Sequence, residues 1–199
     1  MTGQVITARE RAVQVALKEA ADHVREEGTN TGRRVREYQA ADGYKPSPDT
    51  GYAWCASFVN WCFRQAGRPL LELDLQASVG FLERAARERG WLTTRPLRGD
   101  IFCVRYEGDS WPDHTGLVIG VNPDGSLRTV EGNTSDAVLL RVRPREYTQR
   151  CTYIRVPGLV PQPLDKAKPL PGPNPKPAWF WPAVKEAIRR RRPAKGGTP

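Results

Sequence analysis

The most informative stretch of this 199-residue chain is Gly51-Tyr-Ala-Trp-Cys-Ala-Ser-Phe-Val-Asn-Trp-Cys-Phe-Arg-Gln-Ala-Gly67. Its large apolar side chains recur at the i, i+3, i+4 spacing of an amphipathic helix, and Gly67 is typical of a helix end. The pattern predicts a helix over 54–66, with Cys55 in its first turn. A thiol there faces unpaired backbone N–H groups and the positive end of the helix dipole, which favour the thiolate. Cys55 is therefore the candidate nucleophile, although a lone buried cysteine is more often a small core side chain.

The positive charge of the chain is concentrated near its C-terminus. The formal net charge is +9, but residues 1–160 hold 22 basic and 20 acidic side chains, whereas residues 161–199 hold nine basic and two acidic ones. The body is thus nearly neutral. A surface that attracts an anionic partner is expected in the tail and not in the folded body.

The four cysteines are expected to be free thiols. Cys55 and Cys62 are seven residues apart on one predicted helix, roughly 10 Å along its axis, which is too far for a disulfide. The first ten residues contain no apolar core of a signal peptide, and no segment reaches the length that spans a bilayer. We therefore expect synthesis in a cytoplasm.

Helices precede strands along the chain. A first helix is predicted over 7–27, with a Thr7-x-x-Glu10 capping box and Gly28 as its end, and a short second helix runs through Val35 and Tyr38. After the Cys55 helix, another is predicted over 78–90. Strands are predicted after Gly99 and over 114–121, 126–131, 138–142 and 151–156. This order favours an α+β domain whose Cys55 helix packs on an antiparallel sheet.

A thiolate nucleophile needs a base and a group that orients the base. The chain holds two histidines, of which His23 falls on a polar helix face and His114 at the start of an apolar strand. If residues 122–125 form a four-residue hairpin turn, Val121 faces Ser126 and His114 lies opposite Asn133, with Glu131 as its diagonal neighbour. Both side chains are then within reach of the imidazole. A register slip of one residue would move them to the other face.

Four motifs together resemble the CHAP domain, the cysteine, histidine-dependent amidohydrolase/peptidase group of the NlpC/P60-like papain-fold superfamily. They are Tyr52-Ala-Trp-Cys-Ala-Ser-Phe-Val-Asn-Trp-Cys62, Arg98-Gly-Asp-Ile-Phe102, Asp113-His-Thr-Gly-Leu-Val-Ile-Gly120 and Val130-Glu-Gly-Asn-Thr-Ser135. The resemblance covers about residues 5–157 and implies a papain-like fold.

The resemblance also implies roles for individual residues. Cys55 would attack an amide carbonyl, His114 would act as the base and Glu131 would orient the imidazole, with Asn133 as a further polar neighbour. Tyr52 and Trp54 would contact the substrate, although Tyr52 fits turn packing equally well. The chain lacks the aspartate-rich calcium loop of some CHAP members, and Asp42 and Asp49 do not have calcium-loop spacing, so neither a metal nor another cofactor is expected.

The sequence divides into a catalytic domain over 1–157, a proline-rich linker over 158–177 and a basic aromatic tail over 178–199. The tail places Trp179, Phe180 and Trp181 before four consecutive arginines, and it has the pattern of a short amphipathic helix. This composition suits an anionic envelope surface such as lipopolysaccharide, phospholipid or a wall polymer. The alternatives are a tail that only aids solubility and aromatic side chains that pack on the domain. Nothing in the body favours nucleic acid.

The implied substrate is bacterial peptidoglycan, cut at the muramoyl–alanine amide or at a peptide bond of the stem or cross-bridge. A phage or prophage endolysin, released through a holin-type lesion and acting at the cell wall as a monomer, fits these features. An interbacterial wall amidase toxin and a catalytically inactive wall-binding module remain as alternatives. The catalytic residues alone do not distinguish between these amide bonds, and they leave host range open.

Overall fold

The computed structural model describes residues 6–43, 51–70, 77–106 and 110–158. All of them fall within one compact unit, Met1–Ala167. The predicted linker and tail lie almost wholly outside the described residues, as does most of the loop around Asp49. The division into three segments therefore stays a prediction.

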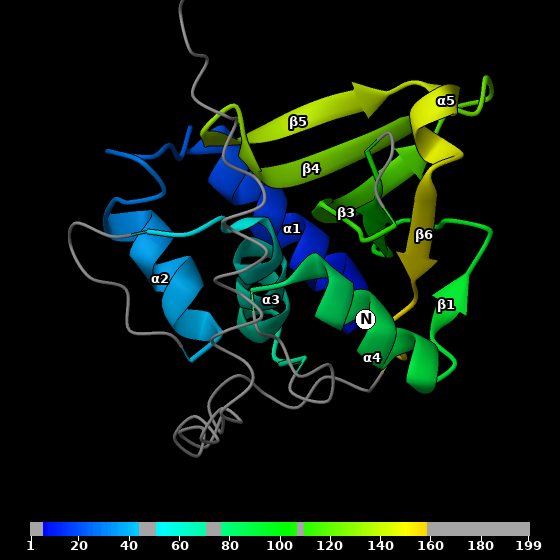
Figure 1. The fold of residues 1–199 in the computed structure, drawn as a ribbon, viewed down its shortest axis with the longest axis horizontal. Helices are drawn as coiled ribbons and strands as arrows, with labels where there is room; N and C mark the ends of the chain where they lie inside the picture. The colour runs from blue at the N-terminus through cyan, green and yellow to red at the C-terminus, as the bar shows by residue number, and fades with distance from the viewer. Residues whose placement is uncertain (1–5, 44–50, 71–76, 107–109, 159–199) are drawn as a thin grey trace, which may run out of the picture. The chain divides into compact units, whose positions relative to one another are not determined.

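The centre of the domain is a six-stranded antiparallel sheet in the order β1-β6-β2-β3-β4-β5 (Figure 1). Its strands are β1 Leu92–Thr93, β2 Ile101–Val104, β3 His114–Val121, β4 Leu127–Thr134, β5 Ala137–Arg143 and β6 Cys151–Ile154. The two-residue β1 was not predicted, because a pair of residues carries no periodicity. The other five strands were predicted, and the α+β fold class is confirmed.

Within the described residues, four helices precede the strands: α1 Ala8–Ala21, α2 Arg33–Ala41, α3 Cys55–Gln65 and α4 Val79–Glu88. Contacts join α3 to β3 and β4, and α1 to β3, β4 and β5, while α2 packs on α3 (Figure 1). A fifth helix, α5 Arg145–Thr148, is a single turn before β6. The main core fills the space between helices and sheet, and the largest side chains that it buries completely include Trp54, Tyr38, Phe58, Phe63 and Leu82. The Cys55 helix thus lies against the centre of the sheet, as predicted.

The first helix ends earlier than its apolar pattern predicts. It closes at Ala21, with His23 in the left-handed region at φ 53°, instead of continuing to Glu27. The chain then runs beside the start of β5, where the Val138 N–H donates to Val24 O and the Glu26 N–H donates to Asp136 O, both at 2.9 Å. These tertiary hydrogen bonds replace the last helical turns. Thr7 caps the helix as predicted, accepting from Glu10 N at 3.2 Å.

The β3–β4 hairpin corrects one step of the predicted register. Val121 pairs with Leu127 and not with Ser126, so the prediction was wrong by one residue at the turn. A bulge between Val118 and Gly120 then absorbs the extra residue, and Val118 pairs with Thr129 and Leu117 with Val130. The sequence predicts this same register for the half of the hairpin that contains His114. A bulge inserts one extra residue into one strand, so the side chains beyond it lie again on the predicted face of the sheet.

Asp100 ties the first helix to the sheet. Its side chain is wholly buried and accepts hydrogen bonds from Arg9 at 2.8 Å, from Arg155 at 2.7 and 3.1 Å, and from the Leu97 N–H at 2.8 Å. A buried carboxylate is tolerated because these donors replace its water. The Gly99-Asp100 motif therefore has a structural role.

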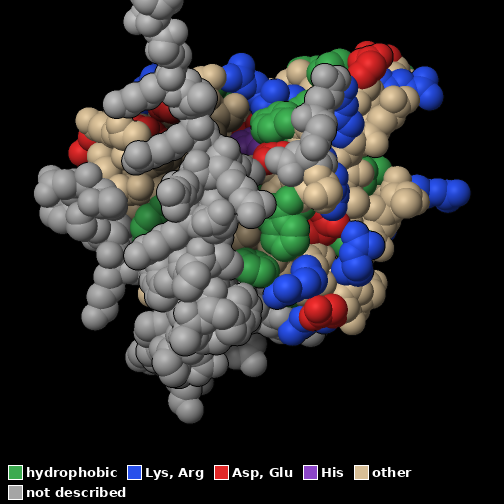
Figure 2. Space-filling view, viewed as in Figure 1, with side chains coloured by type: hydrophobic (Ala, Val, Ile, Leu, Met, Phe, Trp, Pro, Cys, Tyr) green, Lys and Arg blue, Asp and Glu red, His purple; other side chains and the backbone are tan. Residues whose placement is uncertain are grey.

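Figure 2 shows basic side chains, with acidic ones scattered among them, over the described part of this face. Among the described residues, no helix has the length and apolar character needed to cross a membrane.

Candidate active site

Cys55 is the first residue of α3, and its side chain is buried, with 4% of its surface exposed. Trp54 is the N-cap, and its carbonyl accepts the first intrahelical bond from Phe58 N at 2.8 Å. The N–H groups of the first turn, beginning with that of Cys55, have no acceptor within the helix. They are therefore oriented as donors next to the sulfur, as the sequence predicts.

His114 is the first residue of β3 and is 7% exposed. Its side chain lies close enough to the Cys55 side chain for the two to interact, and it hydrogen bonds to the Glu131 carboxylate. The bond to Glu131 joins Nε2 to Oε2 at 2.9 Å. The structure thus brings Cys55, His114 and Glu131 together in the order thiol, imidazole and carboxylate, which confirms the predicted contact between His114 and Glu131.

Glu131, in β4, is completely buried and fully hydrogen bonded. Oε1 accepts from Thr129 Oγ1 at 2.6 Å and from Arg143 Nε at 2.8 Å. Oε2 accepts from His114 and from Arg143 Nη2. Thr129 and Arg143 were not identified from the sequence. The β4–β5 pairing places Arg143 opposite Leu127, from where its long side chain reaches Glu131, and no local motif marks that pairing.

The electrostatics of this trio favour the imidazolium. Burial alone would lower the pKa of His114, but the hydrogen bonds to Cys55 and Glu131, together with their negative charges, outweigh it and raise the pKa to about 9. Burial alone would raise the pKa of Glu131, but the bonds from His114 and Arg143 lower it to about 2. His114 therefore holds its proton at neutral pH beside an ionised carboxylate.

Two glycines make room for the site. A Cβ on Gly116 would lie 2.8 Å from Val130 O and 2.9 Å from Glu131 Cγ. A Cβ on Gly132 would lie 2.6 Å from Phe58 atoms of α3. Both distances are shorter than side chains tolerate. Gly116 thus leaves the space that Glu131 occupies beside His114, and Gly132 lets α3 approach β4.

Asn133 does not take the place predicted for it. Its backbone is left-handed, at φ 55°, and its amide lies 3.2 Å from Asn30 Oδ1. With the amide oxygen turned toward α3, this oxygen accepts from the Trp54 N–H at 3.0 Å and the amide nitrogen donates to Glu26 Oε1 at 3.3 Å. The predicted contact with the imidazole is thus replaced, because the left-handed turn directs the side chain to the N-terminus of α3. Asn133 supports the helix that carries Cys55.

Trp54 was predicted to contact substrate, and this prediction is wrong. Its side chain has no exposed surface and packs against Tyr38, with ring centroids 5.5 Å apart. Its indole Nε1 donates to Glu26 at 2.7 Å. The helical pattern does not reveal whether an aromatic N-cap faces the solvent or the core. Tyr52 lies in the segment before α3 and is partly buried, so its predicted contact with substrate stays a prediction.

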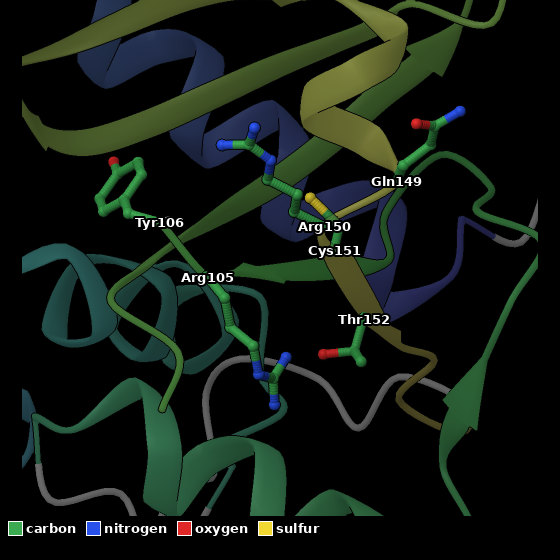
Figure 3. A pocket seen from close by; sticks show the side chains of 6 residues that line it. All are labelled: Arg105, Tyr106, Gln149, Arg150, Cys151 and Thr152. Atoms are coloured by element: carbon green, nitrogen blue, oxygen red, sulfur yellow. The ribbon is translucent and has the colours of Figure 1, made fainter. Parts of the chain in front are cut away.

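A surface cavity of about 420 Å³ opens between the segment that follows β2 and the start of β6 (Figure 3). Its lining includes Arg105, Tyr106 and Cys151. Val104 pairs with His114 on one side and with Cys151 on the other, so the cavity begins about two strand spacings from His114. Figure 3 shows Arg105 running toward α4, where it bonds Glu83 at 2.7 and 2.8 Å. Its lining does not include Cys55, His114 or Glu131.

The other three cysteines are free thiols, as predicted, and burial raises the pKa of each. Among the described residues, no three His, Cys, Asp or Glu side chains gather in the manner of metal ligands.

Comparison with known proteins gives a family and one solved structure. Residues 47–133 match the family model described as CHAP domain. A crystal structure of an N-acetylmuramoyl-L-alanine amidase from Staphylococcus aureus is similar with a TM-score of 0.42 and 18% identity, over 56% of this chain and 33% of that chain. The chain thus spans about a third of that structure. No curated protein matches. The segment that matches the CHAP domain model contains Cys55, His114 and Glu131.

Proposed function

We propose that this protein is a cysteine-dependent hydrolase that cleaves an amide bond of bacterial peptidoglycan. One observation carries the proposal: Cys55, at the N-terminus of α3, lies beside His114, whose Nε2 bonds the buried Glu131 at 2.9 Å. The CHAP domain match supports a peptidoglycan hydrolase.

In the proposed reaction, the Cys55 sulfur attacks the amide carbonyl and forms a tetrahedral oxyanion. The Cys55 N–H is directed at this oxygen, and one such donor typically contributes about 3 kcal/mol. His114 then gives its proton to the leaving amine, the C–N bond breaks and a thioester remains. A water molecule, deprotonated by His114, attacks the thioester and releases the carboxylic acid and the thiol. Glu131 keeps the imidazole oriented through both steps.

Two wall bonds fit this chemistry, the muramoyl–alanine amide and a peptide bond in the stem or cross-bridge. Both hydrolyses release a new amino group and leave the glycan strand intact. Purified sacculi treated with the enzyme should therefore gain amino termini but no reducing sugar ends, and Cys55→Ala should release neither. The released fragment masses would name the bond. Reducing ends as the main product would refute amide cleavage.

The setting that we propose is a phage or prophage endolysin, made in the cytoplasm and acting at the wall as a monomer. We also propose that residues 178–199, with their arginine run, bind an anionic envelope surface. Deleting residues 158–199 should then reduce lysis of whole cells more than hydrolysis of purified sacculi. An equal loss in both assays would reject this role of the tail.

A further inference from the structure

Arg143 is the last residue of β5, outside the segment that matches the CHAP family. Its guanidinium donates to both oxygens of Glu131, through Nε to Oε1 at 2.8 Å and through Nη2 to Oε2. The Arg143 side chain is itself only 21% exposed. A forked pair of this kind fixes the plane of a carboxylate as well as its position.

Arg143 and His114 share one acceptor. Glu131 Oε2 accepts from His114 Nε2 and from Arg143 Nη2. The guanidinium therefore competes with the imidazole for the charge of a single buried carboxylate. A positive group next to Glu131 also opposes the positive charge of the imidazolium.

We propose that Arg143 is a positioning residue that fixes Glu131 and moderates its pull on the His114 proton, so that His114 can still release this proton to the leaving amine. The inference rests on the proposed cysteine mechanism. A buried carboxylate with the imidazole as its only charged partner would hold the imidazolium too strongly. A general acid works best when its pKa lies near the working pH, and Arg143 shifts the balance in that direction.

Other titratable side chains surround Cys55, His114 and Glu131, and most of them are neutral in the pH range of the His114 titration. Tyr147 of α5 lies under the Arg143 guanidinium, 4.7 Å from ring centroid to Cζ. Burial raises the pKa values of Tyr106, Tyr147 and Cys151. The charged neighbours are the Cys55 thiolate of the proposed mechanism, on α3, and Asp113, next to His114, whose carboxylate accepts from Tyr106 N at 3.1 Å. Neither contacts Arg143 in a described hydrogen bond, so replacing Arg143 acts first on Glu131.

The direct test is an NMR titration of the imidazoles in the full-length protein. The chain has two histidines, and His23→Gln assigns the signal of His114. Arg143→Met should raise the titration midpoint of His114 by about one pH unit, because a nearby charge typically shifts a pKa by one to three units. Arg143→Lys keeps the positive charge and should leave the midpoint close to that of the wild type.

Arg141→Met is the matched control. Arg141 lies two residues earlier on the same face of β5 and bonds Ser135 Oγ at 2.9 Å instead of Glu131. It should leave the midpoint unchanged. If Arg143→Met does not fold, Arg143→Gln removes the charge and keeps a donor, and the same upward shift is expected. An unchanged or lowered midpoint in the neutral variants would overturn the inference.

Hydrolysis of sacculi gives the second readout. In Arg143→Met, kcat at pH 7 should fall about tenfold with little change in KM, because proton donation and not binding is impaired. If the wild type hydrolyses no sacculi at all, the proposed function fails, whereas the titration still decides whether Arg143 controls the His114 proton.

Discussion

Glu131→Gln should abolish most of the pH dependence that His114 gives to the stability of the domain. The substitution keeps the size of the side chain but removes the charge that faces Nε2 at 2.9 Å. In the wild type, the pKa of His114 is raised from 6.5 to about 9. A group whose pKa is raised by folding stabilises the protein fully below its unfolded pKa, and this contribution disappears as the pH rises through the folded pKa.

The magnitude follows from the shift. At 1.36 kcal/mol per pH unit, a rise from 6.5 to about 9 corresponds to about 3 kcal/mol of stability, present below pH 6.5 and lost by about pH 9. In Glu131→Gln, the pKa of His114 keeps only the part of its upward shift that Cys55 contributes. It should also be about 3 kcal/mol less stable at pH 7, because Arg143 loses its buried partner.

Urea unfolding of the wild type and of Glu131→Gln at pH 6 and at pH 9 measures both effects. Between the two pH values, the wild type should lose more stability than the variant, by over half of about 3 kcal/mol, because the buried cysteines contribute the same loss to both proteins. Equal losses in both proteins would refute the claim that Glu131 holds the His114 proton.

Three further substitutions test the supporting residues. Gly116→Ala should lower the free energy of unfolding by about 1–3 kcal/mol through overpacking, since its Cβ would lie 2.9 Å from Glu131 Cγ. Hydrolysis by the folded variant should fall at least about tenfold. A variant that is both active and stable would contradict this packing. Asn133→Ala removes the acceptor of the Trp54 N–H and should lower kcat without moving the His114 titration, whereas a shifted titration would place Asn133 at the imidazole. Arg98→Ala breaks an exposed pair with Glu10 at 2.7 Å and should change the free energy of unfolding by less than about 1 kcal/mol, with unchanged activity; a larger loss in urea unfolding would argue against a surface role.

The elements that the sequence predicts well are those whose signals are local. The Cys55 helix has its apolar stripe and Gly67, and the structure begins and ends α3 within a residue of the predicted bounds. The first helix was predicted six residues too long, because its apolar pattern continues while Val24 and Glu26 form hydrogen bonds to the β5 region. Those bonds depend on the tertiary fold and leave no trace in local periodicity.

The sequence predicts those site residues that the order of helices and strands brings together. It misses those that depend on the pairing of β4 with β5 or on packing. Cys55, His114 and Glu131 come from a helix N-terminus, a strand start and a hairpin. The hairpin prediction reached the right partner only because a bulge near Ile119 offsets an error at the turn. Arg143 requires the β4–β5 pairing, and Gly116 and Gly132 act through space that only the packed structure defines.

The most direct test of the central claim is alkylation of the native enzyme by iodoacetamide, with peptide mapping and hydrolysis of sacculi followed in parallel. Cys62, Cys103 and Cys151 serve as internal references, because burial raises their pKa values and keeps them protonated. Cys55 should react first, and activity should fall in proportion to its modification. Full activity with Cys55 completely alkylated would contradict it.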